Sequence, residues 1–160
     1  MKEIAIIGGG LAGLINAILL NRAGFSVTLF EEKKYPFHRV CGEYISNEGI
    51  PFLRYEGLYP DELAPQSIIN FHLSSPSGKE VIMSLDLGGF GLSRYALDHW
   101  LYNKAENEGV HFVFDRVLAC QFHENHFHIQ TRNGIEKTSD LSIVLLYIEI
   151  LSTNGAPMLE

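Results

Sequence analysis

Glycines stand at the first, third and sixth positions of a short segment that follows an apolar run. They are Gly8, Gly10 and Gly13, and the run covers residues 4–7. In nucleotide-binding turns the first glycine permits a tight bend, the second lets a pyrophosphate approach the backbone, and the third lets a helix lie close to a sheet. The N–H groups and the dipole at the start of that helix attract phosphate. The spacing therefore predicts a phosphate-binding turn.

The segments around this turn favour the same function. The run 4–7 is short and apolar like a buried parallel strand, and apolar residues then recur at helical spacing until Gly24. A second strand, 26–30, ends at Glu31, whose carboxylate can accept hydrogen bonds from both ribose hydroxyls of an adenosine. This context favours dinucleotide binding over the alternative, a glycine-rich turn in an ordinary α/β domain. Glu31 would repel a 2′-phosphate, which disfavours NADP, whereas NAD and FAD both stay open.

The loop after the second strand gathers residues that carry chemistry. Its sequence, His38-Arg39-Val40-Cys41-Gly42-Glu43, places a cation, a thiol, a glycine and an acid together. A loop directly after the ribose acid would pass over the cofactor, where Arg39 would meet phosphate and Gly42 would allow close backbone approach. The alternative is a solvated loop with an incidental cysteine, and both interpretations stay open.

A second helix is predicted from an N-cap at Ser93 to a stop at Gly109, with Leu97, Leu101 and Ala105 on one face. Arg94 lies in its first turn, where the helix dipole disfavours a cation. This conflict suggests that Arg94 serves an anion such as a phosphate or a carboxylate. The alternative is an ordinary surface arginine.

The rest of the chain is predicted to form short strands and hairpins. The predicted elements are a short helix within 47–58 broken by Gly49 and Pro51, a hairpin of 67–73 and 80–84, a flexible segment 88–92, a buried strand 110–114, a hairpin of 116–122 and 126–131, a turn at 133–134, and a buried strand within 141–151. His123, His126 and His128 lie on the second hairpin. No cysteine or carboxylate completes a usual ligand set, so we interpret them as a polar strand face and predict no metal.

Composition limits the class of protein. The 160 residues predict one domain, and 46% hydrophobic residues are enough for a core. Only 19% are charged, below the roughly 25% of an average soluble protein, so we expect part of the surface to be covered. The net charge of −7 argues against a nucleic-acid partner. No signal peptide is recognisable, and Cys41 and Cys120 form no disulfide framework, so we expect a cytoplasmic location, with a membrane surface as an unsupported alternative.

Three blocks of sequence resemble one family. They are Ile4 to Gly13 through Glu31, the segment 36–43 with its Pro, basic residues, Cys-Gly and acid, and the segment 92–110 with its Arg, Leu-Asp, Ala and Gly-Val. Together the blocks make the chain similar to FAD-dependent oxidoreductases of the geranylgeranyl reductase type, within the aromatic-hydroxylase-like flavoproteins. The resemblance covers roughly residues 1 to 120 and implies an α/β, Rossmann-like FAD-binding domain of the glutathione-reductase type with inserted β-hairpins.

The resemblance also implies a set of cofactor contacts. FAD would occupy the glycine turn, Glu31 would hold the adenosine ribose, Cys41 and Gly42 would lie near the flavin, and backbone near Val117 or Leu118 would touch the adenine. The predicted cofactor-binding residues are Gly8, Gly10, Leu11, Ala12, Gly13, Glu31, Glu32, Arg39, Cys41, Gly42, Arg94 and Leu118. No residue is predicted to act as a catalytic acid or base.

The chain departs from the family after residue 143. The family has a glycine-acid-glycine turn there, whereas this sequence continues Leu145-Leu146-Tyr147. We therefore expect a truncated FAD-binding domain over 1–143 and a divergent tail over 144–160. The complete enzyme would reduce or oxidise an apolar small molecule, such as an isoprenoid or a polyketide, with NAD(P)H as the reductant. The alternatives are a non-catalytic fragment with residual FAD affinity and an NAD-binding module; either way, exposed apolar surface predicts self-association.

Overall fold

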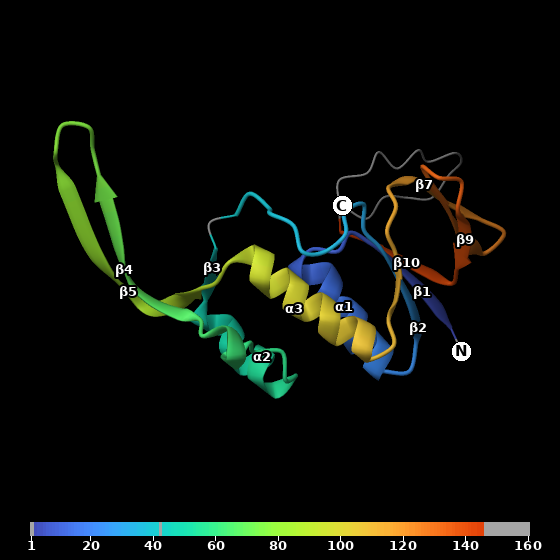
Figure 1. Cartoon of the computed structure of the whole chain (residues 1–160), viewed down its shortest axis with the longest axis horizontal. Helices are drawn as coiled ribbons and strands as arrows, with labels where there is room; N and C mark the ends of the chain where they lie inside the picture. Colours follow the sequence, from blue (N-terminus) through green and yellow to red (C-terminus); the bar gives the residue numbers. More distant parts are fainter. Residues whose placement is uncertain (1, 42, 146–160) are drawn as a thin grey trace. The chain divides into compact units, whose positions relative to one another are not determined.

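The computed structural model describes residues 2–41 and 43–145 (Figure 1). Two compact units make up the chain. The first combines the chain up to Tyr35 with the chain from Leu101 onward, and the second is Pro36–Trp100. Within the described residues, no helix is long and apolar enough to cross a membrane.

The first unit is built on a parallel sheet in the strand order β10-β1-β2-β6. Its strands are β1 (Glu3–Ile7), β2 (Ser26–Phe30), β6 (His111–Val113) and β10 (Leu141–Val144). The two central strands are buried at four of their five positions, because parallel strands are covered on both faces. Ile7 pairs with both Phe30 and Val144, so the carboxyl ends of these strands meet at one edge.

Helix α1 (Leu11–Arg22) buries Leu14, Ala17 and Ile18. A three-stranded antiparallel sheet adds β7 (Val117–His123), β8 (His126–Thr131) and β9 (Glu136–Ser139). Its buried side chains form one cluster with side chains of the parallel sheet: Ala5, Ile7, Phe30, Val117, Cys120 and Ile129. The parallel sheet is thus held by apolar contacts from the antiparallel sheet, as a Rossmann-like layer arrangement requires.

The second unit contains a three-stranded antiparallel sheet in the order β3-β5-β4. Its elements are β3 (Tyr44–Ser46), η1 (Asn47–Gly49), α2 (Ile50–Tyr55), η2 (Asp61–Leu63), β4 (Gln66–Ser74) and β5 (Glu80–Gly91), and α3 (Arg94–Asn107) begins here and ends in the first unit. The hairpin of β4 and β5 turns at Ser75–Gly78, where the Gly78 N–H donates to the Ser75 carbonyl at 3.0 Å. This hairpin and that of β7 and β8 confirm two predictions from turn chemistry.

Three predictions about local structure were wrong. The segment 88–92 is not a flexible approach, because Gly88 to Gly91 complete strand β5, and a Cβ at Gly89 would overlap the Tyr44 ring. The predicted strand 110–114 is present as β6 but is not fully buried: Val110 is buried, whereas β6 is an edge strand with an exposed His111. Pro51 lies in the first turn of α2, where its missing N–H costs nothing, so it begins the helix that it was expected to break.

Only part of the predicted C-terminal strand lies among the described residues. Leu141–Val144 forms β10, which pairs in parallel with β1 at an edge of the sheet. Residues 146–160, most of the predicted divergent tail, lie outside the described residues.

Candidate nucleotide-binding site

The glycine turn follows β1 at the carboxyl edge of the parallel sheet. Gly8 has a φ of +110°, a backbone angle that residues with a side chain rarely adopt. Its N–H donates to the Phe30 carbonyl at 2.9 Å. A Cβ at Gly13 would overlap the Gly8 carbonyl oxygen. The turn therefore needs glycine at both positions, one for its bend and one for the close approach of α1.

Gly10 precedes α1 in an extended conformation, with φ −79° and ψ −174°. Its carbonyl accepts the Leu14 N–H at 2.9 Å, which makes the first hydrogen bond of the helix. Leu11 and Ala12 lie in the first turn, where N–H groups have no acceptor within the helix. No side chain caps this end, and no acid stands in the first turn, so the helix start favours an anionic ligand.

Glu31 is held beside this turn by backbone groups. Its side chain is only 6% exposed, and its Oε2 accepts the Gly9 N–H at 3.0 Å. Its Oε1 accepts the N–H of Lys33, also at 3.0 Å. The two bonds fix the carboxylate between the glycine turn and the loop after β2. Glu32, by contrast, is exposed and forms an ion pair with Arg132 at 3.1 Å.

Two residues at this site escaped the sequence analysis. The Tyr35 hydroxyl donates to the Gly9 carbonyl, and a Cβ at Gly9 would overlap the Tyr35 oxygen and press on the side chain of Glu31. Tyr35 also stacks on Tyr102, with ring centroids 4.8 Å apart. Gly9 stands at a variable position of the motif, and only the run of three glycines hinted at its constraint. The Tyr35 contact spans 26 positions and had no local signal.

In the second unit, Asp98 joins two predicted cofactor residues. Arg94 binds it through two bonds, Nε to Oδ1 at 2.8 Å and Nη2 to Oδ2 at 2.9 Å. Arg39 Nε reaches Oδ2 at 3.1 Å. Asp98 is 2% exposed, so this carboxylate is buried between two guanidinium groups and leaves the cluster with one net positive charge. The position of Arg94 in the first turn suggested an anionic partner. Within the chain, that partner is the Asp98 carboxylate, four residues further along the same helix.

Cys41 lies exposed beside this cluster. Its Sγ accepts the Glu43 N–H at 3.4 Å and lies 3.9 Å from Arg94 Nη1. The Glu43 N–H is the main cause, and the Arg94 guanidinium the second, of a lowered pKa for the Cys41 thiol. This environment favours the thiolate. Gly42, the next predicted residue, lies outside the described residues.

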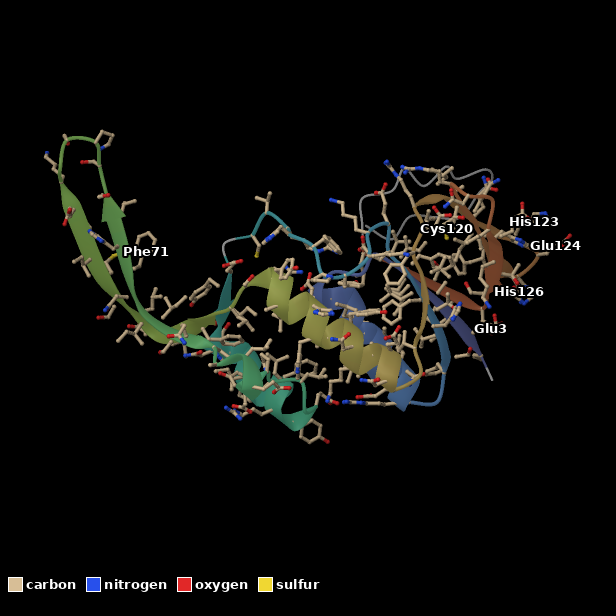
Figure 2. All side chains as sticks on the ribbon, in the orientation of Figure 1. Glu3, Phe71, Cys120, His123, Glu124 and His126 are labelled. Carbon is tan, nitrogen blue, oxygen red and sulfur yellow. The ribbon has the colours of Figure 1, made fainter. Side chains whose placement is uncertain are left out.

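Leu118, the residue predicted near the adenine, lies on β7. Its side chain is 53% exposed, and it falls where the pairing with β8 shifts between Val117 and Ala119. On the same hairpin His123 pairs with His126 (Figure 2). Across the described ranges, no three His, Cys, Asp or Glu side chains gather closely enough to hold a metal ion.

The predicted residues thus fall into separate groups. The glycine turn and Glu31 are brought together in the first unit, with Leu118 on its antiparallel sheet. Arg39, Cys41 and Arg94 are brought together in the second.

Comparison with known proteins agrees with this geometry. Residues 6–48 match the model of the NAD(P)-binding Rossmann-like domain family. A probable electron transfer flavoprotein-quinone oxidoreductase of Escherichia coli is 30% identical over 140 residues, covering 77% of this chain and 30% of that protein. Kynurenine 3-monooxygenase of Cytophaga hutchinsonii is 33% identical over 136 residues, covering 74% of this chain and 29% of that protein. Halogenase PltM, solved with phloroglucinol and FAD, has a similar fold, with a TM-score of 0.74 at 17% identity over 91% of this chain and 34% of PltM.

The chain is similar in sequence to parts of a flavoprotein oxidoreductase and of a monooxygenase, and it has a Rossmann-like fold. The brominase Bmp2, with a TM-score of 0.71 at 21% identity over 89% of this chain and 37% of Bmp2, has the same fold. The α/β fold predicted from the sequence is therefore confirmed. The chain spans about a third of the length of these curated relatives.

Proposed function

We propose that this chain binds FAD and forms the cofactor-binding part of a flavin-dependent oxidoreductase. The observation that carries the proposal is Glu31, held at 3.0 Å from the Gly9 N–H beside a turn whose geometry requires glycine. That arrangement sets a ribose-binding acid next to a phosphate-binding helix start. Relatives whose names denote flavoproteins and monooxygenases support FAD over NAD.

Several of the predicted residues have a role in this proposal. Glu31 receives the adenosine ribose, and the backbone from Gly10 to Gly13 receives the pyrophosphate. Arg39 and Arg94 offer guanidinium donors to the cofactor, oriented by the buried Asp98. When bound, FAD supplies the electron-transfer chemistry, and the protein supplies binding, orientation and electrostatics.

The finer assignment rests on the sequence resemblance. We place the substrate among apolar small molecules such as isoprenoids or polyketides, and the reductant is NADH or NADPH. The Cys41 segment supports this geranylgeranyl reductase-like assignment, because it is the block most specific to that family. The second candidate is an NAD-binding module, which the description of the matching family model favours.

Flavin fluorescence tests the proposal. Titration of FAD with the purified chain is expected to quench the flavin emission, and excess NAD is expected not to restore it. Gly10→Val should abolish the quenching, because its side chain would occupy the space of the pyrophosphate. The control is Gly49→Val, since a Cβ at Gly49 meets nothing within 4 Å. Binding of NAD but not of FAD would instead establish the NAD-binding module.

Turnover is a separate question. An anaerobic assay with NADH or NADPH and an isoprenoid acceptor is expected to show no turnover by these 160 residues alone. Turnover by a monodisperse preparation would show that the chain is a whole enzyme and would refute the incomplete-domain interpretation.

A further inference from the structure

The hairpin of β4 and β5 carries one apolar face. We call this surface the apolar hairpin face and define it by five residues: Ile69, Phe71, Leu73, Val81 and Met83. Phe71 pairs with Met83, and Leu73 pairs with Val81. Because side chains alternate along a strand, these pairs and Ile69 lie on the same side of the hairpin. Phe71 is labelled on the hairpin in Figure 2.

The opposite face of the hairpin is mostly polar. It carries Asn70, His72, Ser84 and Glu80, and His72 Nε2 lies 3.3 Å from Glu80 Oε2. Ile82 is the large apolar residue on this side. Such a division of apolar and polar residues is typical of a sheet with one covered face and one solvated face. In the described chain, however, the apolar hairpin face is exposed.

The size of this exposed area is enough for a specific contact. The exposed fractions are 61% for Ile69, 43% for Phe71, 58% for Leu73, 51% for Val81 and 51% for Met83. Five large side chains, each about half exposed, present on the order of 500 Å² per copy. Two such faces would bury about 1,000 Å² together, which is where specific protein–protein interfaces begin.

The absence of charge from this face is compatible with a second copy of this chain as the partner. Two copies that each carry a net charge of −7 repel one another, so their contact must add no further pairs of like charges. Strand β4 contains no Asp, Glu, Lys or Arg, and alternation along the regularly paired part of β5 places Glu80 on the polar face. An apolar face without charge is self-complementary, and a two-fold contact brings the same residues together.

We propose that the apolar hairpin face joins two copies of this chain face to face about a two-fold axis. Sheets that pack in this way lie about 10 Å apart with their apolar side chains interdigitated. The polar face with His72 and Glu80 then stays in water on both sides of the dimer. The inference is independent of the cofactor, so its failure leaves the proposed FAD site untouched.

Sedimentation velocity on the 160-residue chain tests this inference. Between about 1 and about 100 µM the parent chain is expected to shift from monomer to dimer and no further. Phe71→Ser and Met83→Ser should each weaken the dimer about tenfold or more, because each removes a buried apolar group. Ile82→Ser is the matched control: it alters the neighbouring residue, is 66% exposed and lies on the other face, so it should leave the dimer unchanged.

Several outcomes would overturn the inference. One is a parent chain that stays monomeric at the highest concentration. Another is equal weakening by Ile82→Ser and Met83→Ser, or growth into open-ended aggregates. Flotation of the chain with neutral phospholipid vesicles, lost in Phe71→Ser, would assign the face to a membrane surface in place of a second copy. Circular dichroism melts check that the variants fold. We expect all three to fold, because the substituted positions are exposed.

Discussion

The substitution Glu31→Gln distinguishes the structural role of this carboxylate from its role in cofactor binding. In the parent, both carboxylate oxygens accept a backbone N–H, from Gly9 and from Lys33. A glutamine amide has one oxygen to accept and one NH₂ that only donates. The oxygen is expected to keep the buried Gly9 N–H, which leaves the NH₂ against the Lys33 N–H. Leaving a donor unsatisfied costs about 1–3 kcal/mol, and the lower part of that range applies because the Lys33 bond is only partly buried.

Thermal unfolding without ligand measures this cost. For a chain of this length, 1 kcal/mol shifts the Tm by about 2–4 °C, so a loss of about 1–2 kcal/mol predicts a Tm lower by roughly 2–8 °C. Glu32→Gln is the matched control, because Glu32 is exposed and its ion pair with Arg132 contributes at most about 1 kcal/mol. Equal melting curves for Glu31→Gln and the parent would refute the reasoning that Glu31 holds the turn and the loop together. FAD affinity, measured below the Tm of both proteins, should fall about tenfold or more.

Three further predictions follow from the contacts. Gly13→Ala should lower the Tm and FAD affinity, because its Cβ overlaps the Gly8 carbonyl, whereas Gly49→Ala should change neither quantity. Cys41 should be alkylated at a pH below the ordinary thiol pKa of 9.0, while Cys120, whose pKa is raised by burial, should react only on unfolding; equal rates in the folded protein would contradict this. Hydrogen bonds from the Thr131 side chain and from backbone N–H groups lower the pKa of Asp115, so Asp115→Asn should destabilise the protein fully above about pH 4; urea unfolding at several pH values should show this difference shrinking as the pH falls below that.

The glycine turn could be predicted because its constraints are local. The bend at Gly8 and the contact of Gly13 with the Gly8 carbonyl are set within six residues. The position of Glu31 follows from the pairing of β2 with β1, which the two short apolar runs predict. The clamp by Tyr35 could not be predicted, since its stacking on Tyr102 depends on how the chain returns after a whole second unit.

The surroundings of Arg94 could be predicted only in part from the sequence. Its unfavourable place in the first turn of α3 was visible and correctly indicated an anionic partner. Asp98 lies four residues further on, at the spacing of a helical ion pair, so that partner was also in the sequence. Nothing in the sequence indicated that Arg39 would bind the same carboxylate, because that contact joins positions 59 residues apart. The prediction for Gly89 was wrong. Its lack of a side chain suggested flexibility, whereas it allows close packing against Tyr44.

The low charge content gains a physical meaning from the hairpin. Composition alone predicted covered surface but gave it no location. The turn at 75–78 fixes the pairing of Leu73 with Val81, and alternation then assigns Phe71 and Met83 to the same face. That much follows from the sequence once the hairpin is recognised. The exposure of the face does not, because it depends on every other described element packing elsewhere. A strand pair with about 500 Å² of apolar surface on one face is stable in water only when that surface is covered. The apolar hairpin face is therefore where association of this chain should begin.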